Sequence, residues 1–189
     1  EQGRAIRFTE EAVRAMGRTA AGVYAMRLED GDAITGVDVV EPDGDLLLIT
    51  EYGYGKRVAL SEFRQQGRYG KGVRAMVIGR LTGRIVGARV VTGDDEVTCI
   101  SSNGIILRTQ VKNVSRQGRY SRGVTVMDLR DGDSVASVAV IREGRLSQNG
   151  KDNGEAEGEL QVLPDGELVA PDPTTGNGHS PLAADDMDA

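Results

Sequence analysis

The chain has almost none of the residues on which metal and catalytic sites usually depend. Its 189 residues include no tryptophan, one cysteine and one histidine. His179 has no cysteine or histidine partner at metal-ligand spacing. Neither a zinc-protease motif nor a phosphate-binding P-loop is present in the sequence. The sequence therefore predicts a segment with no catalytic residue, no metal and no cofactor of its own.

Long apolar runs and paired cysteines are missing as well. No run approaches the ~20 residues that cross a membrane, and no signal peptide opens the chain. Cys99 stands alone in the apolar stretch Val97–Ile100, which is typical of a buried strand. These absences predict no membrane partner and a cytoplasmic location. Because residue 1 is a glutamate, we also expect a segment of a longer protein.

Charge is distributed unevenly along the chain. Residues 1–145 carry 22 lysines and arginines against 19 acids, whereas residues 146–189 carry one base and ten acids. Such asymmetry is typical of a polyanion-binding region joined to an acidic tail. We expect residues 1–145 to form one domain and residues 146–189 to form a largely disordered tail, with a possible hairpin at 160–169.

What the chain has in abundance is repetition. One short signature occurs three times, and its first glycines are 50 and 51 residues apart. Its copies are Gly17–Val23 (GRTAAGV), Gly67–Val73 (GRYGKGV) and Gly118–Val124 (GRYSRGV). An apolar residue, a turn and a β-branched run follow each copy. We place the repeats at about 3–53, 54–104 and 105–145.

The repeats predict strands, and only Thr9–Met16 has a helical pattern. The expected strands include Ile34–Val40, Leu46–Thr50, Ile85–Val91, Val97–Ser101 and Val135–Ile141. A period near 50 residues with about four strands is the signature of propeller blades. We therefore predict an all-β, propeller-like fold with about three four-stranded blades. Since a propeller typically has about four to eight blades, we expect further blades before residue 1.

Basic residues recur in phase with the signature. In a ring of blades, residues in phase occupy equivalent places, so they predict a curved basic belt around the rim. Such a belt suits the phosphates of duplex DNA and positions the duplex without reading its sequence. The candidate DNA-binding residues are Arg18, Lys56, Arg57, Arg64, Arg68, Lys71, Arg74, Arg108, Lys112, Arg116, Arg119 and Arg122. For one signature alone, turn geometry with solvated arginines is the favoured explanation, whereas three copies in register favour DNA.

Four segments of the chain carry a likeness to a known family. They are Ala5–Gly17 (AIRFTEEAVRAMG), Gly53–Ala59 (GYGKRVA), Ile100–Arg108 (ISSNGIILR) and the segment from Val111 to Val124. Together they resemble the C-terminal domain of bacterial DNA gyrase A. The likeness covers about residues 1–142. It implies a six-bladed β-pinwheel, a propeller variant whose blades exchange a strand, with the three blades here forming its second half. It also implies a domain that wraps duplex DNA around a basic rim and so supports negative supercoiling.

The family's decisive wrapping motif is the gyrase-A box, Q-R-R-G-G-K-G, which lies in the first blade and is not present in this sequence. Gln66–Gly72 (QGRYGKG) resembles a degenerate copy, and Gln117–Gly123 (QGRYSRG) a weaker one. Met16–Gly22 keeps only Arg18 and Gly22 of the motif. Topoisomerase IV domains usually have fewer and more degenerate blades, so the well-kept repeats favour gyrase.

The resemblance further implies a parent enzyme, an ATP-dependent type IIA topoisomerase whose cleavage tyrosine, ATP site and Mg lie in other domains. The implied partners are double-stranded DNA, the rest of the gyrase A protein as a homodimer, and the gyrase B protein in an A2B2 heterotetramer. The acidic end also resembles gyrase tails that, in some members, compete with DNA for the rim. Two alternatives are the corresponding C-terminal domain of topoisomerase IV and a non-catalytic propeller scaffold that binds protein.

Overall fold

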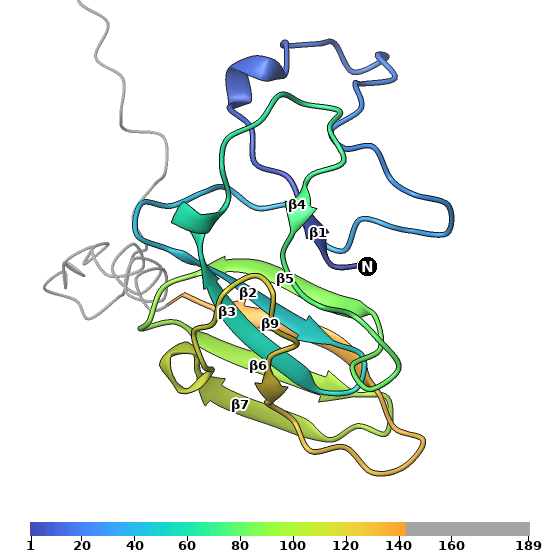
Figure 1. The fold of residues 1–189 in the computed structure, drawn as a ribbon, viewed down its shortest axis with the longest axis vertical. Helices are drawn as coiled ribbons and strands as arrows, with labels where there is room; N and C mark the ends of the chain where they lie inside the picture. The colour runs from blue at the N-terminus through green and yellow to red at the C-terminus, as the bar shows by residue number, and fades with distance from the viewer. Residues whose placement is uncertain (143–189) are drawn as a thin grey trace, which may run out of the picture. The chain divides into compact units, whose positions relative to one another are not determined.

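Extended chain and short 3-10 turns make up residues 1–142, which are the residues that this computed structural model describes (Figure 1). The turns are η1 (Glu10–Ala12), η2 (Leu60–Glu62) and η3 (Val111–Asn113). Of the helical pattern at Thr9–Met16, only η1 forms a helical turn. The prediction of an all-β fold is confirmed. The predicted acidic tail at 146–189, with its hairpin at 160–169, lies outside the described residues.

The strands of the described part form three antiparallel sheets. They are β1 (Arg4–Ala5), β2 (Asp45–Thr50), β3 (Tyr54–Ala59), β4 (Val73–Arg74), β5 (Ile85–Val91), β6 (Glu96–Ser101), β7 (Ile106–Gln110), β8 (Val124–Thr125) and β9 (Val135–Ile141). The sheet orders are β1-β4, β5-β2-β3-β8 and β7-β6-β9. Within residues 1–142 these sheets do not close into a ring (Figure 1).

Consecutive repeats exchange strands. The hairpin β2-β3 turns at Tyr52-Gly53, where Gly53 has a φ of +78°. β5 then returns to pair with β2, and β8, from the repeat that follows, pairs with β3. The same order places β9 on β6 and β4 on β1. The second and third signature sequences therefore each end in a short strand that is added to the preceding repeat.

Two apolar clusters hold the sheets together. One lies between β2 and β6 and includes Leu47, Ile49, Val97 and Cys99. The other covers the opposite face of the central sheet and includes Leu48, Val58, Phe63 and Met76. Cys99 is buried as the sequence predicts, and burial raises the pKa of its thiol to about 11, so the thiol stays protonated at neutral pH.

The sheet of β7, β6 and β9 is buried on one face only. Residues of β7 alternate between exposed and half-buried, and the side chain of Ile106 is 66% exposed. The equivalent residue of the central sheet, Gly55, pairs with Val124 of β8. Within residues 1–142, no strand pairs with β7 as β8 pairs with β3. The third sheet is therefore the outermost blade of the described part.

The prediction of a strand at Ile34–Val40 is wrong for this structure, because residues 33–40 form no strand. The equivalent runs β5 and β9 each pair with a strand that lies about 40 residues earlier in the chain. For Ile34–Val40 no such partner is among residues 1–142. Val37 and Val39 are accordingly 79% and 78% exposed. The run has strand-forming residues, but among residues 1–142 no strand pairs with it.

The last glycine of the signature is explained by the strand exchange. Gly72 and Gly123 have φ of +67° and +80°, and a Cβ on either would lie 2.5 Å from a backbone oxygen of the preceding repeat, Ala5 O or Gly55 O. Gly22 occupies the same phase with a φ of +85°, but nothing lies within 4 Å of its Cβ position. The glycine therefore permits close approach of two backbones wherever the preceding strand is present.

Replacing Gly123 by alanine is expected to lower the free energy of unfolding by about 3 kcal/mol, because it adds a clash to the strain of a positive φ. Gly22→Ala carries the strain alone and is expected to cost about 1 kcal/mol. Urea unfolding of both variants gives the comparison. Equal losses would show that the contact between Gly123 and Gly55 contributes nothing.

Candidate nucleic-acid interface

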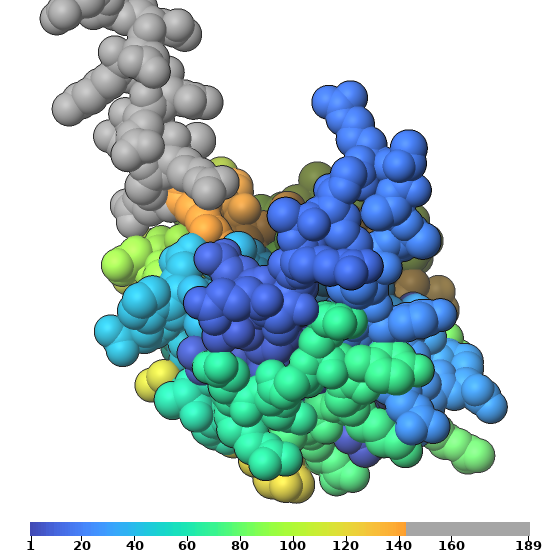
Figure 2. All heavy atoms as spheres, turned by 90° about the horizontal axis from the view of Figure 1, so that it is seen from above, coloured from blue at the N-terminus to red at the C-terminus, as the bar shows by residue number. Residues whose placement is uncertain are grey.

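Of the three signature loops, Met16–Gly22, Gln66–Gly72 and Gln117–Gly123, the second and third lie where one repeat meets the next. The backbone N–H of Tyr69 donates to Ala25 O at 2.9 Å, and that of Arg27 donates to Gly70 O at 3.0 Å. In the space-filling view, the blue first repeat and the green segment that carries the second loop lie side by side on one face (Figure 2). The second loop is thus a neighbour of the first repeat in space as well as its equivalent in sequence.

Eight of the twelve candidate residues expose their side chains. They are Arg18, Arg64, Lys71, Arg74, Arg108, Lys112, Arg116 and Arg122. Three of these are engaged in ion pairs: Lys71 with Glu29 at 3.7 Å, Arg116 with Asp45 at 2.9 Å, and Arg108 with Glu96. Arg18, Arg64, Lys112 and Arg122 form no side-chain hydrogen bond or ion pair with another described residue. Their guanidinium and ammonium groups can meet phosphates without first breaking a contact of that part of the chain.

Among the eight exposed candidates, Lys71 and Arg122 are the best matched pair. They occupy the same place in successive signature loops, 51 residues apart. Both precede the glycine that lies over the neighbouring strand. A cation therefore recurs at the same structural position in two consecutive repeats, as a basic belt requires.

Lys56 and Arg57 lie inside the structure. Lys56 is 0% exposed, and its ammonium donates to Gly118 O at 2.7 Å and to both oxygens of Ser121. Arg57 donates to Val114 O at 2.8 Å and to the carboxylate of Asp45 at 3.1 Å. Both cations are thus bound by oxygens of the protein, and a phosphate has no free donor to contact on Lys56.

Arg68 and Arg119, the arginines of the Gly-Arg signature, are half-buried and connect neighbouring segments. Arg68 donates to the backbone oxygens of Ala12 and Tyr24. Arg119 donates to Arg74 O at 3.3 Å and lies 3.8 Å from the carboxylate of Glu62. In the second and third repeats, the signature arginine therefore connects neighbouring segments of the protein. The sequence pattern did not reveal this structural role.

Two tyrosines of the loops pack against their neighbours. The ring of Tyr120 lies 5.9 Å from the guanidinium of Arg74 and 5.4 Å from that of Arg119. The ring centroids of Tyr69 and Tyr24 are 5.2 Å apart. Cation–π contacts of this kind hold the arginines in place while leaving the N–H groups at their edges able to donate. Tyr120 itself is 71% exposed.

A recurring arginine joins each repeat to the next, a role that the sequence analysis missed. Arg7 donates to Leu60 O at 3.2 Å, and Arg57 donates to Lys112 O at 3.4 Å, so each reaches the 3-10 turn of the next repeat. Arg108 has the same phase and pairs instead with Glu96 on its own sheet. The spacings of 50 and 51 residues between the three arginines were the available signal.

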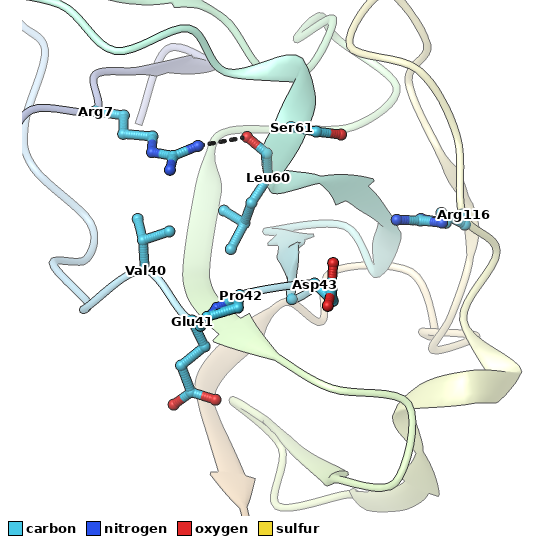
Figure 3. A pocket seen from close by; sticks show the side chains of 9 residues that line it. Arg7, Val40, Glu41, Pro42, Asp43, Leu60, Ser61 and Arg116 are labelled. Carbon is cyan, nitrogen blue, oxygen red and sulfur yellow. Dashed lines mark hydrogen bonds between the residues drawn. The ribbon is translucent and has the colours of Figure 1, made fainter.

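The described part also contains a hollow of about 610 Å³ that is lined by residues of all three repeats (Figure 3). Its lining combines Arg7 and Arg116 with the acids Glu41 and Asp43. Arg7 already donates to Leu60 O, and Arg116 is bound by Asp45. The hollow therefore has mixed charge, and both of its lining cations are already engaged with oxygens of the protein.

Lys56 provides a pH-dependent contribution to stability. Burial lowers the pKa of its ammonium from 10.5 to about 8, while the charge of Glu62 acts in the opposite direction. Between these two values the unfolded chain binds a proton that the folded chain has released, so stability rises with pH.

We expect the free energy of unfolding to increase by on the order of 1–3 kcal/mol between pH 8 and 10.5 because of this residue. The rise should be absent from Lys56→Met. Urea unfolding of both proteins at several pH values measures it, and parallel curves would contradict the assignment.

Within residues 1–142, no three acidic, histidine or cysteine side chains are grouped as metal ligands, and no helix has the length and apolarity of a membrane span. The exchanged strands and repeated basic loops define a module of the β-propeller class. A family model described as "DNA gyrase C-terminal domain, beta-propeller" matches residues 1–41, 44–92 and 95–142. The chain belongs to this family of DNA gyrase C-terminal domains.

Individual relatives agree with this assignment. The DNA gyrase A protein of Staphylococcus epidermidis is 41% identical over 140 residues, which are 73% of this chain and 16% of that protein. The corresponding protein of Kosmotoga olearia is 44% identical over 142 residues, 74% of this chain and 18% of its own length. This chain therefore spans less than a fifth of these two curated relatives.

Two solved structures have the same fold. A DNA gyrase A C-terminal domain superposes with a TM-score of 0.70 at 34% identity, covering 75% of this chain and 48% of that one. The C-terminal domain of a DNA topoisomerase IV superposes with a TM-score of 0.73 at 26% identity, covering 81% and 49%. The fold is thus common to both enzymes, and the sequence identity favours gyrase.

Proposed function

We propose that this chain binds and bends duplex DNA as part of the wrapping surface of a DNA gyrase A protein. The observation that carries the proposal is the exposed cation in phase on successive loops, Lys71 and Arg122. Arg18, Arg64 and Lys112 extend this basic set, while Lys56, Arg57, Arg68 and Arg119 donate to backbone oxygens of other segments. The names of the relatives support a role within DNA gyrase.

The chemistry of strand breakage belongs, in this proposal, to parts of the larger protein outside this sequence. The parent protein acts as an ATP-dependent topoisomerase in the cytoplasm, with gyrase A as a homodimer and gyrase B as its partner. ATP and Mg serve those other domains. The task of the present chain is to bend DNA, for which charge and backbone contacts suffice.

Two linear duplexes of unrelated sequence and equal length test the mode of binding. We expect affinities within about twofold of each other, because phosphate contacts carry no sequence information. Strong preference for one duplex would indicate base readout and contradict the proposal.

Bending is tested separately, on relaxed circular DNA. The circle is incubated with the 189-residue chain, relaxed by a type I topoisomerase and deproteinised. A shift in linking number that grows with protein concentration is the expected result. Binding without any shift would indicate a DNA-binding protein that does not wrap.

A further inference from the structure

One recurring position, in contact with the loop of the next repeat, holds different residues in different repeats. The loop residue that it contacts differs as well. Ile6, Lys56 and Leu107 share a phase, at spacings of 50 and 51 residues. Ile6 lies under the second loop, where its Cδ1 is 3.4 Å from the position that a Cβ on Gly70 would take. Lys56 lies under the third loop, where it donates to Ser121, the residue in phase with Gly70. The apolar Ile6 thus lies next to Gly70, whereas Lys56 lies next to Ser121 at the equivalent place of the following loop.

The ammonium of Lys56 is fully occupied by the third loop. Its acceptors are Gly118 O at 2.7 Å, Ser121 O at 3.0 Å and Ser121 Oγ at 3.2 Å. A lysine has three N–H donors, so none remains for a ligand. Gly118 O also accepts from the hydroxyl of Ser121 at 3.2 Å. The lysine and the serine together determine the conformation of Gly118–Ser121.

The exposed Tyr120 and the half-buried Arg119 lie within this segment, and the exposed Arg122 follows directly. The backbone N–H of Arg119 donates to Glu62 at 3.3 Å, and Tyr120 packs against Arg119 and Arg74. A change in the backbone at Gly118–Ser121 therefore moves the exposed cation at Arg122 and the tyrosine beside it.

We propose that Lys56 is a positioning residue of the DNA-binding surface, which holds the loop Gln117–Gly123 in its binding conformation without touching DNA. The inference rests on the proposed function, because it takes duplex DNA as the ligand of this loop. When the donor is lost, only a fraction of molecules has the competent loop, and the apparent affinity falls by that fraction. The phosphate contacts of the complex stay the same in number.

Hydrogen exchange of the full chain without DNA tests the structural half of the proposal. In Lys56→Met, the amides of residues 118–123 are expected to exchange about tenfold faster, whereas those of the second loop are unchanged. Arg122→Gln, an exposed change in the same loop, is the matched control and should leave exchange as in the parent. Unchanged exchange in Lys56→Met would overturn the proposal whether or not the chain binds DNA.

DNA titration at several salt concentrations tests the other half. Lys56→Met is expected to bind about fivefold more weakly, with an unchanged slope of log K against log salt. Arg122→Gln should lower the steepness of that slope by about 0.9, the value for one lost phosphate contact. A similar loss of steepness in Lys56→Met would show that Lys56 contacts DNA. If even the parent chain binds no DNA, the proposed function fails, and the exchange experiment still decides whether Lys56 orders the loop.

The double variant Lys56→Ile, Ser121→Gly recreates the pair found under the second loop. We expect it to restore both slow exchange at residues 118–123 and most of the DNA affinity, even if Lys56→Met folds poorly. A double variant with an ordered loop but weak DNA binding would assign the lysine a direct electrostatic role and overturn the proposal. If residues 118–123 of the double variant exchange as fast as in Lys56→Ile alone, the match between residues 56 and 121 is not what orders this loop.

Discussion

Replacing Lys71 and Arg122 together by glutamate is expected to weaken DNA binding about 30-fold or more near 0.1 M salt. Each side chain is exposed and stands at the same place of its loop, so each reversal removes one attraction and adds one repulsion. The steepness of the salt dependence should fall by about 1.8, since each lost phosphate contact contributes about 0.9. Fluorescence anisotropy of a labelled duplex measures both quantities.

The matched control is Arg80→Glu with Arg89→Glu, which changes the net charge equally. These arginines are exposed but lie outside the signature loops. We expect a loss of only a few-fold from them, through the long-range field of the molecule. Equal losses from the two double variants would mean that overall charge governs binding and that the loops form no defined surface.

Replacing Asp45 by asparagine is expected to lower the free energy of unfolding by about 3 kcal/mol. The Asp45 carboxylate is buried and accepts from Arg57 at 3.1 Å and from Arg116 at 2.9 Å. The Arg57 side chain is only 15% exposed, so its charge would remain enclosed without a counter-ion. Arg116 is more than half exposed and loses little. Urea unfolding followed by circular dichroism measures the loss.

The chain provides its own control for this prediction. Glu96 and Arg108 form the equivalent pair, 51 residues later on β6 and β7. No loop among residues 1–142 covers that pair, and Arg108 is 59% exposed. Glu96→Gln is therefore expected to cost less than about 1 kcal/mol. Equal costs at the two sites would show that burial by the next repeat does not decide the strength of the pair.

The strands that the sequence predicts correctly are those whose partners are among residues 1–142. The β-branched runs at Ile85–Val91 and Val135–Ile141 form β5 and β9, because β2 and β6 are there to receive them. Ile34–Val40 has a similar composition and forms no strand. Pattern alone shows what a segment can form, whereas hydrogen-bonding partners decide what it does form.

Exposure of the cations was harder to predict than their recurrence. Lys56 and Arg57 lie in β3, where the pattern of apolar and polar residues does not predict that they are buried. Both are covered by a segment that lies about 60 residues later in the sequence. Lys71 and Arg122 precede a glycine of positive φ in a loop, where their side chains stay exposed. The periodicity of the sequence identifies equivalent positions, but only the packing of the next repeat separates structural cations from those that face solvent.

The salt dependence of DNA binding by the 189-residue chain tests the central claim most directly. If the repeated loops bind phosphates, log K against log salt falls along a straight line, with a slope of about −0.9 for each contact. Contacts from the five exposed cations Lys71, Arg122, Arg18, Arg64 and Lys112 predict a slope of about −4 to −5. Affinity that barely changes with salt would contradict a surface built from these cations.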